Sequence, residues 1–221
     1  MKIESAVILI TSASSILGRS LAIHYAHLGA RLILCDHDET NLMKTVQLCR
    51  QVNDQVHSCV LTSCQPNAVE AILDFVQKTY HQAPDVLINH WPNTALPSFV
   101  DKSASEQFVP QWSALTAHFF LFGYACAQRM RQAHNSGVIV NVISYGEAME
   151  LNGLVSASSM VSGFTQSWAQ ELTPFNIRVG GVIPQLSNES HHCDTLHYEE
   201  LTRHTEYIVA NEYFSGRVMT A

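Results

Sequence analysis

The sequence predicts one α/β domain in which a doubly wound, mostly parallel sheet is covered by helices on both faces. Short apolar runs alternate along the chain with segments of helical periodicity, which is the pattern of parallel strands joined by crossover helices. The 221 residues are 47% hydrophobic and only 14% charged, which is enough apolar material for one large core. No repeat, linker or low-complexity tract interrupts the chain, so residues 1–221 are expected to form a single domain.

The first half of the chain is expected to alternate four strands with three helices. Apolar runs rich in β-branched residues predict strands over Ala6–Thr11, Arg31–Asp36, His57–Thr62 and Asp85–His90. Apolar residues at helical spacing predict helices over Ser20–Gly29, Asp38–Val52 and Pro66–Tyr80. The helix ends carry local signals, because Gly29 can adopt the left-handed conformation, Asp38 can cap an N-terminus, and Pro66 suits a first turn.

The second half continues the alternation. Helical patterns cover Ala104–Met130, Ala157–Leu172 and Tyr198–Asn211, and strand patterns cover Gly137–Ser144, Ile177–Pro184 and Gly216–Thr220. Open α/β sheets bind ligands beyond the carboxyl ends of their strands. The segments expected to line a site are therefore Thr11–Gly18, Asn89–Pro92, Ser144–Tyr145 and Pro184–Gln185.

Charge and composition exclude several classes of partner. The formal net charge is −7 and no basic run offsets it, which argues against nucleic acid and against an anionic membrane surface. The apolar stretch near the N-terminus is too short for a signal peptide or a membrane span. Six cysteines are scattered without a CxxC pair, so we expect reduced thiols and a cytoplasmic protein.

Three motifs in order resemble the short-chain dehydrogenase/reductase family. They are TSASSILG (11–18), DVLINHWPN (85–93) and ASSMVSGFTQSWAQELTPFNIRVGGVIP (157–184), and the similarity extends from about Val7 to Thr220. The resemblance implies a Rossmann-type fold, a nicotinamide dinucleotide cofactor and hydride transfer to or from a carbonyl group.

The first motif departs from the family's phosphate-binding turn. The family's three glycines fall on Ser12, Ile16 and Gly18, so only the last is retained. The β-branched Ile16 is expected to project where the phosphates or adjacent ribose would lie, and it rarely tolerates a positive φ. Ser14 and Ser15 could donate hydroxyl hydrogen bonds to an anion, or they could simply cap the following helix.

The resemblance places two further cofactor contacts. Asp36 falls where the family has an acid that binds the ribose hydroxyls and disfavours NADP; the alternative is a solvated turn residue. Asn89 is retained in the second motif, but His90, Trp91 and Pro92 replace the family's small residues, and Trp91 either fills part of the cleft or covers an apolar patch. We therefore expect no required cofactor and, at most, weak binding of NAD.

The catalytic positions depart furthest. By resemblance, Ser144 matches the serine that orients the substrate, whereas Val155, Ser159 and Leu115 occupy the positions of the tyrosine, the lysine and the asparagine. Valine cannot exchange a proton, and serine carries no charge that would lower a neighbouring pKa. The sequence thus favours a catalytically impaired or inactive protein that acts as a binding, regulatory or assembly module.

A rival interpretation keeps the chain as an active NAD-dependent oxidoreductase. Ser144 would then orient the substrate, and either Tyr145 or His90 would move the proton. Tyr145 follows Ser144 directly, and adjacent residues at a strand end point in opposite directions, so packing at the rim of the cleft is the alternative for it. For His90 the alternative is a hydrogen-bonded structural residue.

One histidine-rich segment has spacing that suits a metal ligand set. It contains His191, His192, Cys193, Asp194 and His197. Zinc prefers such nitrogen and sulfur donors, but no second spaced pair completes a set of four. Solvated loop side chains are the alternative, and no metal site is expected.

The long helix of the second half predicts assembly. Its residues 112–130 are apolar nearly all round, with one stripe formed by Leu115, Phe119, Phe122 and Cys126 and a second by Thr116, Phe120, Gly123 and Ala127. One stripe can cover the sheet, and the other would need a partner. We expect a homodimer through the fourth and fifth helices, the alternative being a helix buried within a monomer. A tetramer is less expected, because the chain stops at Ala221 without the family's C-terminal extension.

Overall fold

A seven-stranded parallel sheet forms the centre of the molecule, in the order β3-β2-β1-β4-β5-β6-β7. The computed structural model describes residues 1–90, 96–97, 104–144, 151–185 and 195–221. The strands are β1 (Val7–Thr11), β2 (Arg31–Asp36), β3 (Val56–Val60), β4 (Val86–His90), β5 (Gly137–Val142), β6 (Ile177–Ile183) and β7 (Arg217–Thr220). All neighbouring strands pair in parallel, which confirms the predicted fold class.

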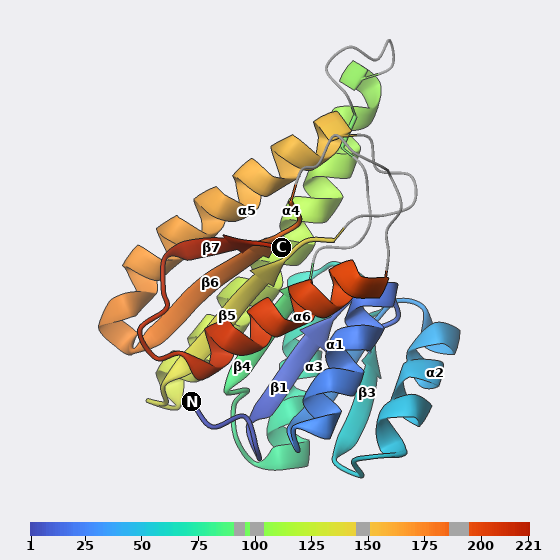
Figure 1. The fold of residues 1–221 in the computed structure, drawn as a ribbon, viewed down its shortest axis with the longest axis vertical. Coiled ribbons are helices and arrows are strands. Elements are labelled where there is room, and N and C mark those ends of the chain that lie inside the picture. The colour runs from blue at the N-terminus through green and yellow to red at the C-terminus, as the bar shows by residue number, and fades with distance from the viewer. Residues whose placement is uncertain (91–95, 98–103, 145–150, 186–194) are drawn as a thin grey trace.

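Helices cover both faces of the sheet. They are α1 (Ile16–His27), α2 (Glu39–Arg50), α3 (Pro66–Tyr80), α4 (Ala104–Gln132), α5 (Leu151–Leu172) and α6 (Thr195–Ala210), with a short 3-10 turn, η1 (Thr173–Phe175), after α5. One apolar core lies under α1, α2 and α6, and the other under α3, α4 and α5. Figure 1 shows α1 and α6 in front of the sheet and α4 behind it.

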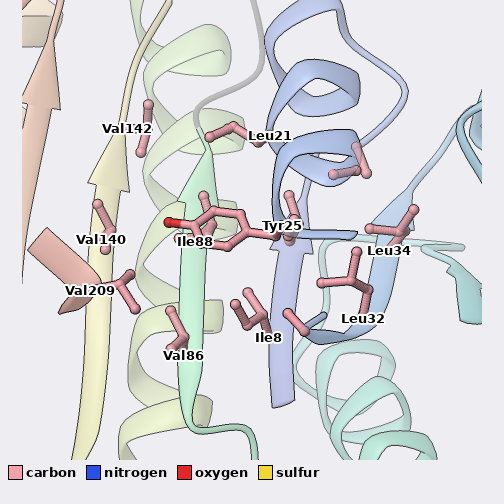
Figure 2. Close-up of a cluster of buried hydrophobic side chains, with 14 of the residues drawn as sticks. Ile8, Leu21, Tyr25, Leu32, Leu34, Val86, Ile88, Val140, Val142 and Val209 are labelled. Atoms are coloured by element: carbon pink, nitrogen blue, oxygen red, sulfur yellow. The ribbon is translucent and has the colours of Figure 1, made fainter. Parts of the chain in front are cut away.

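The core under α1 is organised around one aromatic side chain. Tyr25 is fully buried and lies over the aliphatic side chains of β1 and β4, near Ile8 and Ile88 (Figure 2). Its hydroxyl donates to Thr205 Oγ1 of α6 at 3.2 Å, so the one polar atom of the ring is satisfied within the core. This contact ties α1 to α6 across the front face of the sheet.

The local signals at helix ends are confirmed. Gly29 has φ +76° directly after the C-terminus of α1, and Pro66 is the first residue of α3. The side chain of Asp38 caps α2 by accepting from the amide of Asn41 at 3.0 Å. Such signals depend on a few adjacent residues, which is why the sequence alone identifies them.

Two helices begin more than a full turn earlier than predicted, and α6 begins three residues earlier, at Thr195 instead of Tyr198. Helix α1 begins at Ile16 instead of Ser20, because the Ser15 hydroxyl accepts from the amide of Gly18 at 2.9 Å and so starts the helix one turn sooner. Helix α5 begins at Leu151 instead of Ala157, although its first turns contain Asn152 and Gly153, which are weak helix formers. The weak helix formers therefore do not prevent the helix from extending over this segment.

The prediction about the two stripes of the long helix is partly wrong. Phe119, Phe122 and Cys126 are fully buried against the sheet, as expected, and the side chain of Leu115 lies outside the described part of the structure. The second stripe, however, is half covered within the chain. Gly123 lies so close to Trp168 of α5 that a Cβ there would be 2.5 Å from the indole ring, and Ala127 is also buried. Phe120 remains 47% exposed.

Candidate functional site

The turn after β1 adopts its tight geometry through Ser12 and Gly18. Ser12 has φ +50°, a left-handed conformation that favours glycine. A Cβ on Gly18 would lie 2.1 Å from the carbonyl oxygen of Ser12, so only glycine allows α1 to approach the turn. The expectation that Ile16 conflicts with a positive φ is wrong, because Ile16 is the first residue of α1 and the strained position is Ser12. The Ile16 side chain is 57% exposed at the mouth of the turn.

Much of the hydrogen-bonding capacity of this turn is used within the chain. The amide of Ser14 donates to Asp36 Oδ2 at 2.8 Å, and the amide of Gly18 donates to Ser15 Oγ at 2.9 Å. Among the described residues, the amides of Ile16 and Leu17 are left as the free donors at the start of α1. The turn therefore has fewer donors for a phosphate than an uncapped helix N-terminus has.

Asp36 holds two loops together at the end of β2. Besides Ser14, its carboxylate accepts from the amide of His37 at 2.7 Å and from that of Asp38 at 3.4 Å. The side chain is half-buried, so it is a fixed part of the turn rather than a freely solvated residue. Its Oδ2 atom faces the turn before α1, and its Oδ1 atom accepts from the amides that precede α2.

Asn89 is turned into the core behind the sheet. Its side-chain amide donates to the carbonyl oxygen of Phe119 in α4 at 2.9 Å and to Asn141 Oδ1 of β5 at 3.4 Å. Asn141 in turn donates to Thr165 Oγ1 of α5 at 3.1 Å. These buried contacts tie the ends of β4 and β5 to α4 and α5, so the Asn89 side chain positions the strand end.

His90 connects the turn after β1 to the end of β5. The residue is fully buried; its ring Nδ1 lies 3.3 Å from Ser15 Oγ and its Nε2 lies 3.1 Å from Ser144 Oγ. The hydroxyl of Ser15 donates its only proton to the carbonyl oxygen of Ser12, at 2.8 Å. The Nδ1 atom must therefore carry the imidazole proton and donate to Ser15, which leaves Nε2 to accept from the hydroxyl of Ser144.

Ser15, His90 and Ser144 form a row of side chains with the orientation of a nucleophile, its base and a group that orients the base. A hydroxyl that donates to an imidazole, itself oriented by a third group, is the arrangement found in hydroxyl-activating sites. Burial, however, lowers the pKa of His90 to about 4, so the ring is a weak base and is neutral at neutral pH. Ser144 is itself buried, with 5% of its surface exposed.

The positions expected to carry proton transfer lie on α5. Val155 is 45% exposed and Ser159 is exposed four residues later, so the two share one helix face. Tyr145, Trp91 and Pro92 lie outside the described residues. The segment His191–Asp194 and the side chain of His197 also lie outside them.

A second group of polar side chains, which no motif in the sequence indicates, meets near the ends of β2 and β3. It consists of His37, Cys64 and His118, whose ligand atoms all lie within 4.8 Å of one another. They are separated by 27 and 54 residues along the chain, so no local spacing indicates the group. Only the order of the strands brings them together.

The buried histidine predicts an acid-sensitive fold. The pKa of His90 falls from 6.5 to about 4 on folding, so the unfolded chain takes up a proton between these pH values that the native protein does not. Stability is therefore lost as the pH falls from about 6.5 to about 4, by about 3 kcal/mol from this group.

Urea unfolding measured across this pH range checks the prediction. The variant His90→Gln is expected to reduce the steepness of the pH dependence by up to one proton. The matched variant His27→Gln removes an exposed histidine of α1 and is expected to leave the slope unchanged. Equal slopes in all three proteins would contradict the assignment.

Comparison with known proteins decides the family. Residues 6–195 match the family described as short chain dehydrogenase. The chain belongs to this family. It is 28% identical over 193 residues to a 3-oxoacyl-(acyl-carrier-protein) reductase of Thermotoga maritima, covering 83% of this chain and 75% of that protein. It is 26% identical over 195 residues to a (3R)-3-hydroxyacyl-CoA dehydrogenase of Canis lupus familiaris, covering 83% and 74% of the two chains.

Solved structures of the family share the fold. A short-chain type dehydrogenase/reductase from Mycobacterium marinum superposes with a TM-score of 0.82 at 22% identity, over 99% of this chain and 94% of that one. A hydroxysteroid dehydrogenase from Escherichia coli gives a TM-score of 0.80 at 19% identity, over 99% and 96%. None of the helices in the described part of the chain is long and apolar enough to span a membrane.

Proposed function

We propose that this member of the short-chain dehydrogenase family does not catalyse hydride transfer and serves as a self-associating binding module with, at most, weak affinity for NAD. The observation that carries the proposal is the chemistry around Ser144. Its hydroxyl is committed to His90, whose pKa of about 4 makes it a poor acid or base at neutral pH. The positions expected to hold a tyrosine and a lysine are occupied by Val155 and Ser159.

The turn after β1 supports the second part of the proposal. A pyrophosphate is bound by free backbone amides at and just before a helix N-terminus; here the amide of Ser14, before the helix, is satisfied by Asp36, and that of Gly18, in its first turn, by Ser15. The exposed side chain of Ile16 adds bulk at the mouth of the turn. Any residual preference is for NAD, because a 2′-phosphate would lie near the carboxylate of Asp36.

Calorimetry with NAD, NADH, NADP and NADPH tests the proposal on the purified full chain. We expect dissociation constants of about 1 mM or weaker, with NAD binding better than NADP. The variant Ile16→Gly is expected to strengthen NAD binding if the side chain is the obstacle. Micromolar binding of any of the four by the wild-type protein would refute the proposal, as would a soaked crystal with the dinucleotide fully seated on Ser12–Gly18.

A second candidate function is an active NAD-dependent oxidoreductase with unusual catalytic residues. One observation favours it: the Ser144 hydroxyl donates to the Nε2 atom of His90, an arrangement that could hold or move a proton at a substrate oxygen. Under this candidate, Ser144→Ala would abolish turnover. Under the preferred function, there is no turnover to abolish.

We further propose that the protein forms a homodimer through α4 and α5. Phe120 and Tyr124 are stacked on the outer face of α4, 47% and 53% exposed, and an uncovered aromatic pair of this kind is typical of interfaces. Helix α5 has no charged residue from position 151 to position 170, and several of its exposed residues are small. An isologous contact between the two helices and their symmetry mates buries both features.

The dimer prediction is tested by replacing one exposed aromatic side chain. Phe120→Arg is expected to convert the dimer to a monomer at micromolar concentration in light scattering, because two arginines would face each other across the two-fold axis. The matched variant Tyr213→Arg replaces an aromatic residue that is 92% exposed and lies between α6 and β7, outside α4 and α5, and it is expected to leave the mass unchanged. A monomeric wild-type protein would remove the proposal.

The cellular location and the partners that we propose follow from the thiols and the charge. The cysteines described by the structure, Cys35, Cys49, Cys59, Cys64 and Cys126, are all free, which suits the reducing cytoplasm. The net charge of −7 disfavours nucleic acid and anionic membrane surfaces as partners.

A further inference from the structure

The second polar cluster gathers nitrogen and sulfur donors from three separate elements. His37 directly follows β2, Cys64 precedes α3, and His118 belongs to α4. The Sγ atom of Cys64 lies 3.7 Å from His37 Nε2 and 3.8 Å from His118 Nδ1. In a tetrahedral zinc site, Zn–S bonds of about 2.3 Å and Zn–N bonds of about 2.0–2.1 Å separate sulfur from nitrogen by about 3.6 Å. Both contacts therefore have the spacing of ligands around one ion.

The ring of His37 is held in the tautomer that a metal ligand needs. Its Nδ1 lies 2.6 Å from the carbonyl oxygen of Leu61. Because a carbonyl oxygen can only accept, Nδ1 carries the proton of the neutral ring, and Nε2 presents a lone pair toward Cys64. A backbone carbonyl that fixes the far nitrogen of a histidine in this way is the usual outer contact of metal-binding imidazoles.

His118 provides an imidazole from the interior, with only 5% of its surface exposed. Its Nδ1 faces the thiol of Cys64, while its Nε2 is buried without a hydrogen-bond partner among the described residues. A proton on Nε2 leaves the Nδ1 lone pair directed into the cluster.

The surroundings favour a cation with an open coordination position. The carboxylate of Asp36 adjoins His37 and accepts from its amide at 2.7 Å, which places negative charge beside the cluster. His37 is exposed, Cys64 is half-buried and His118 is buried, so the cluster opens to solvent on one side. Three protein ligands with solvent access match the sites in which a water or an exogenous ligand completes the tetrahedron.

We propose that His37, Cys64 and His118 form a binding site for a thiophilic divalent cation of the zinc class. Cys64 binds as the thiolate, and its proton is released to solvent when the metal binds. The ion would join the loops after β2 and β3 to α4. None of the three side chains belongs to the row Ser15–His90–Ser144, so metal binding can be measured separately from the proposed function.

Metal titration of the chelator-treated full chain tests the site. With Co²⁺, we expect one equivalent to bind and to produce both a thiolate-to-cobalt charge-transfer band and the visible bands of a tetrahedral site. Zn²⁺ is expected to displace the cobalt. Cys64→Ser is expected to remove the charge-transfer band, whereas Cys59→Ser, at a half-buried cysteine outside the cluster, leaves it unchanged.

His37→Gln is the decisive variant, because His37 is exposed and its replacement leaves the core intact. We expect it to weaken Co²⁺ and Zn²⁺ binding at least about tenfold, while His27→Gln binds as the wild type does. A double variant, Cys193→Ser with His197→Gln, removes two donors of the histidine-rich segment around residues 191–197. It is expected to bind Co²⁺ and Zn²⁺ as the wild type does. Wild-type affinity in His37→Gln, loss of binding only in the double variant, or no binding by the wild type would overturn the proposal.

Discussion

Purified protein is expected to turn over no ketone or alcohol substrate with NAD(H) or NADP(H). A positioned acid or base contributes roughly 10²- to 10⁴-fold to such a reaction, and no side chain described near Ser144 provides one that titrates near neutral pH. Val155 has no proton to exchange, and Ser159 has no charge that would lower the pKa of a neighbour. A spectrophotometric assay of nicotinamide oxidation or reduction over a panel of carbonyl compounds measures this directly.

Restoring the two side chains is not expected to restore activity. The double variant Val155→Tyr with Ser159→Lys places both groups on an exposed face of α5, so it is expected to fold. Ile16 would still crowd the turn, and the turn amides would still be satisfied by Asp36 and Ser15. A kcat of about 1 s⁻¹ or more for the wild type on any carbonyl substrate would contradict the proposed function. If Ser144→Ala then abolished that activity, the second candidate function, an active oxidoreductase, would replace the proposed function.

Gly18→Ala is expected to destabilise the fold by about 3 kcal/mol or more. A Cβ at this position would lie 2.1 Å from the carbonyl oxygen of Ser12 and 2.8 Å from the Cα of Ala13. Both neighbours are backbone atoms, so α1 would have to move away from the turn, and with it the buried ring of Tyr25. Urea unfolding followed by circular dichroism measures the loss.

Gly163→Ala is the matched control for this prediction. Because Gly163 is an exposed residue of α5, one of the two helices proposed to form the dimer, both glycine variants are made in the Phe120→Arg background. A Cβ at position 163 has no atom within 4 Å, and the residue lies in the interior of α5. Replacing a helical glycine by alanine there is expected to raise the free energy of unfolding by about 0.5–1 kcal/mol. Similar changes in the free energy of unfolding of the two variants would show that the turn does not depend on the close approach of Gly18 to Ser12.

Part of the candidate site could be predicted from sequence because its residues are adjacent. Ser15 lies between the first strand and the first helix, so the sequence allowed it either to cap the helix or to bind an anion. In the structure it caps α1 and also accepts a hydrogen bond from His90. The sequence could not indicate which residue of the turn takes the positive φ. That conformation is set by the close packing of Gly18 on Ser12, and it falls on Ser12 rather than on Ile16.

The sequence by itself determined the fold class, because alternating strand and helix patterns, Gly29, Asp38 and Pro66 act over a few residues each. Only the tertiary structure decided the environment of the site. The strand order places β1 between β2 and β4, and this arrangement buries His90 between Ser15 and Ser144 and lowers its pKa. The same order brings His37 and Cys64 against His118, which lies 54 residues beyond Cys64 in the chain. The burial of His90 and the meeting of His37, Cys64 and His118 depend on which elements become neighbours in space. No local pattern in the sequence predicts those neighbours.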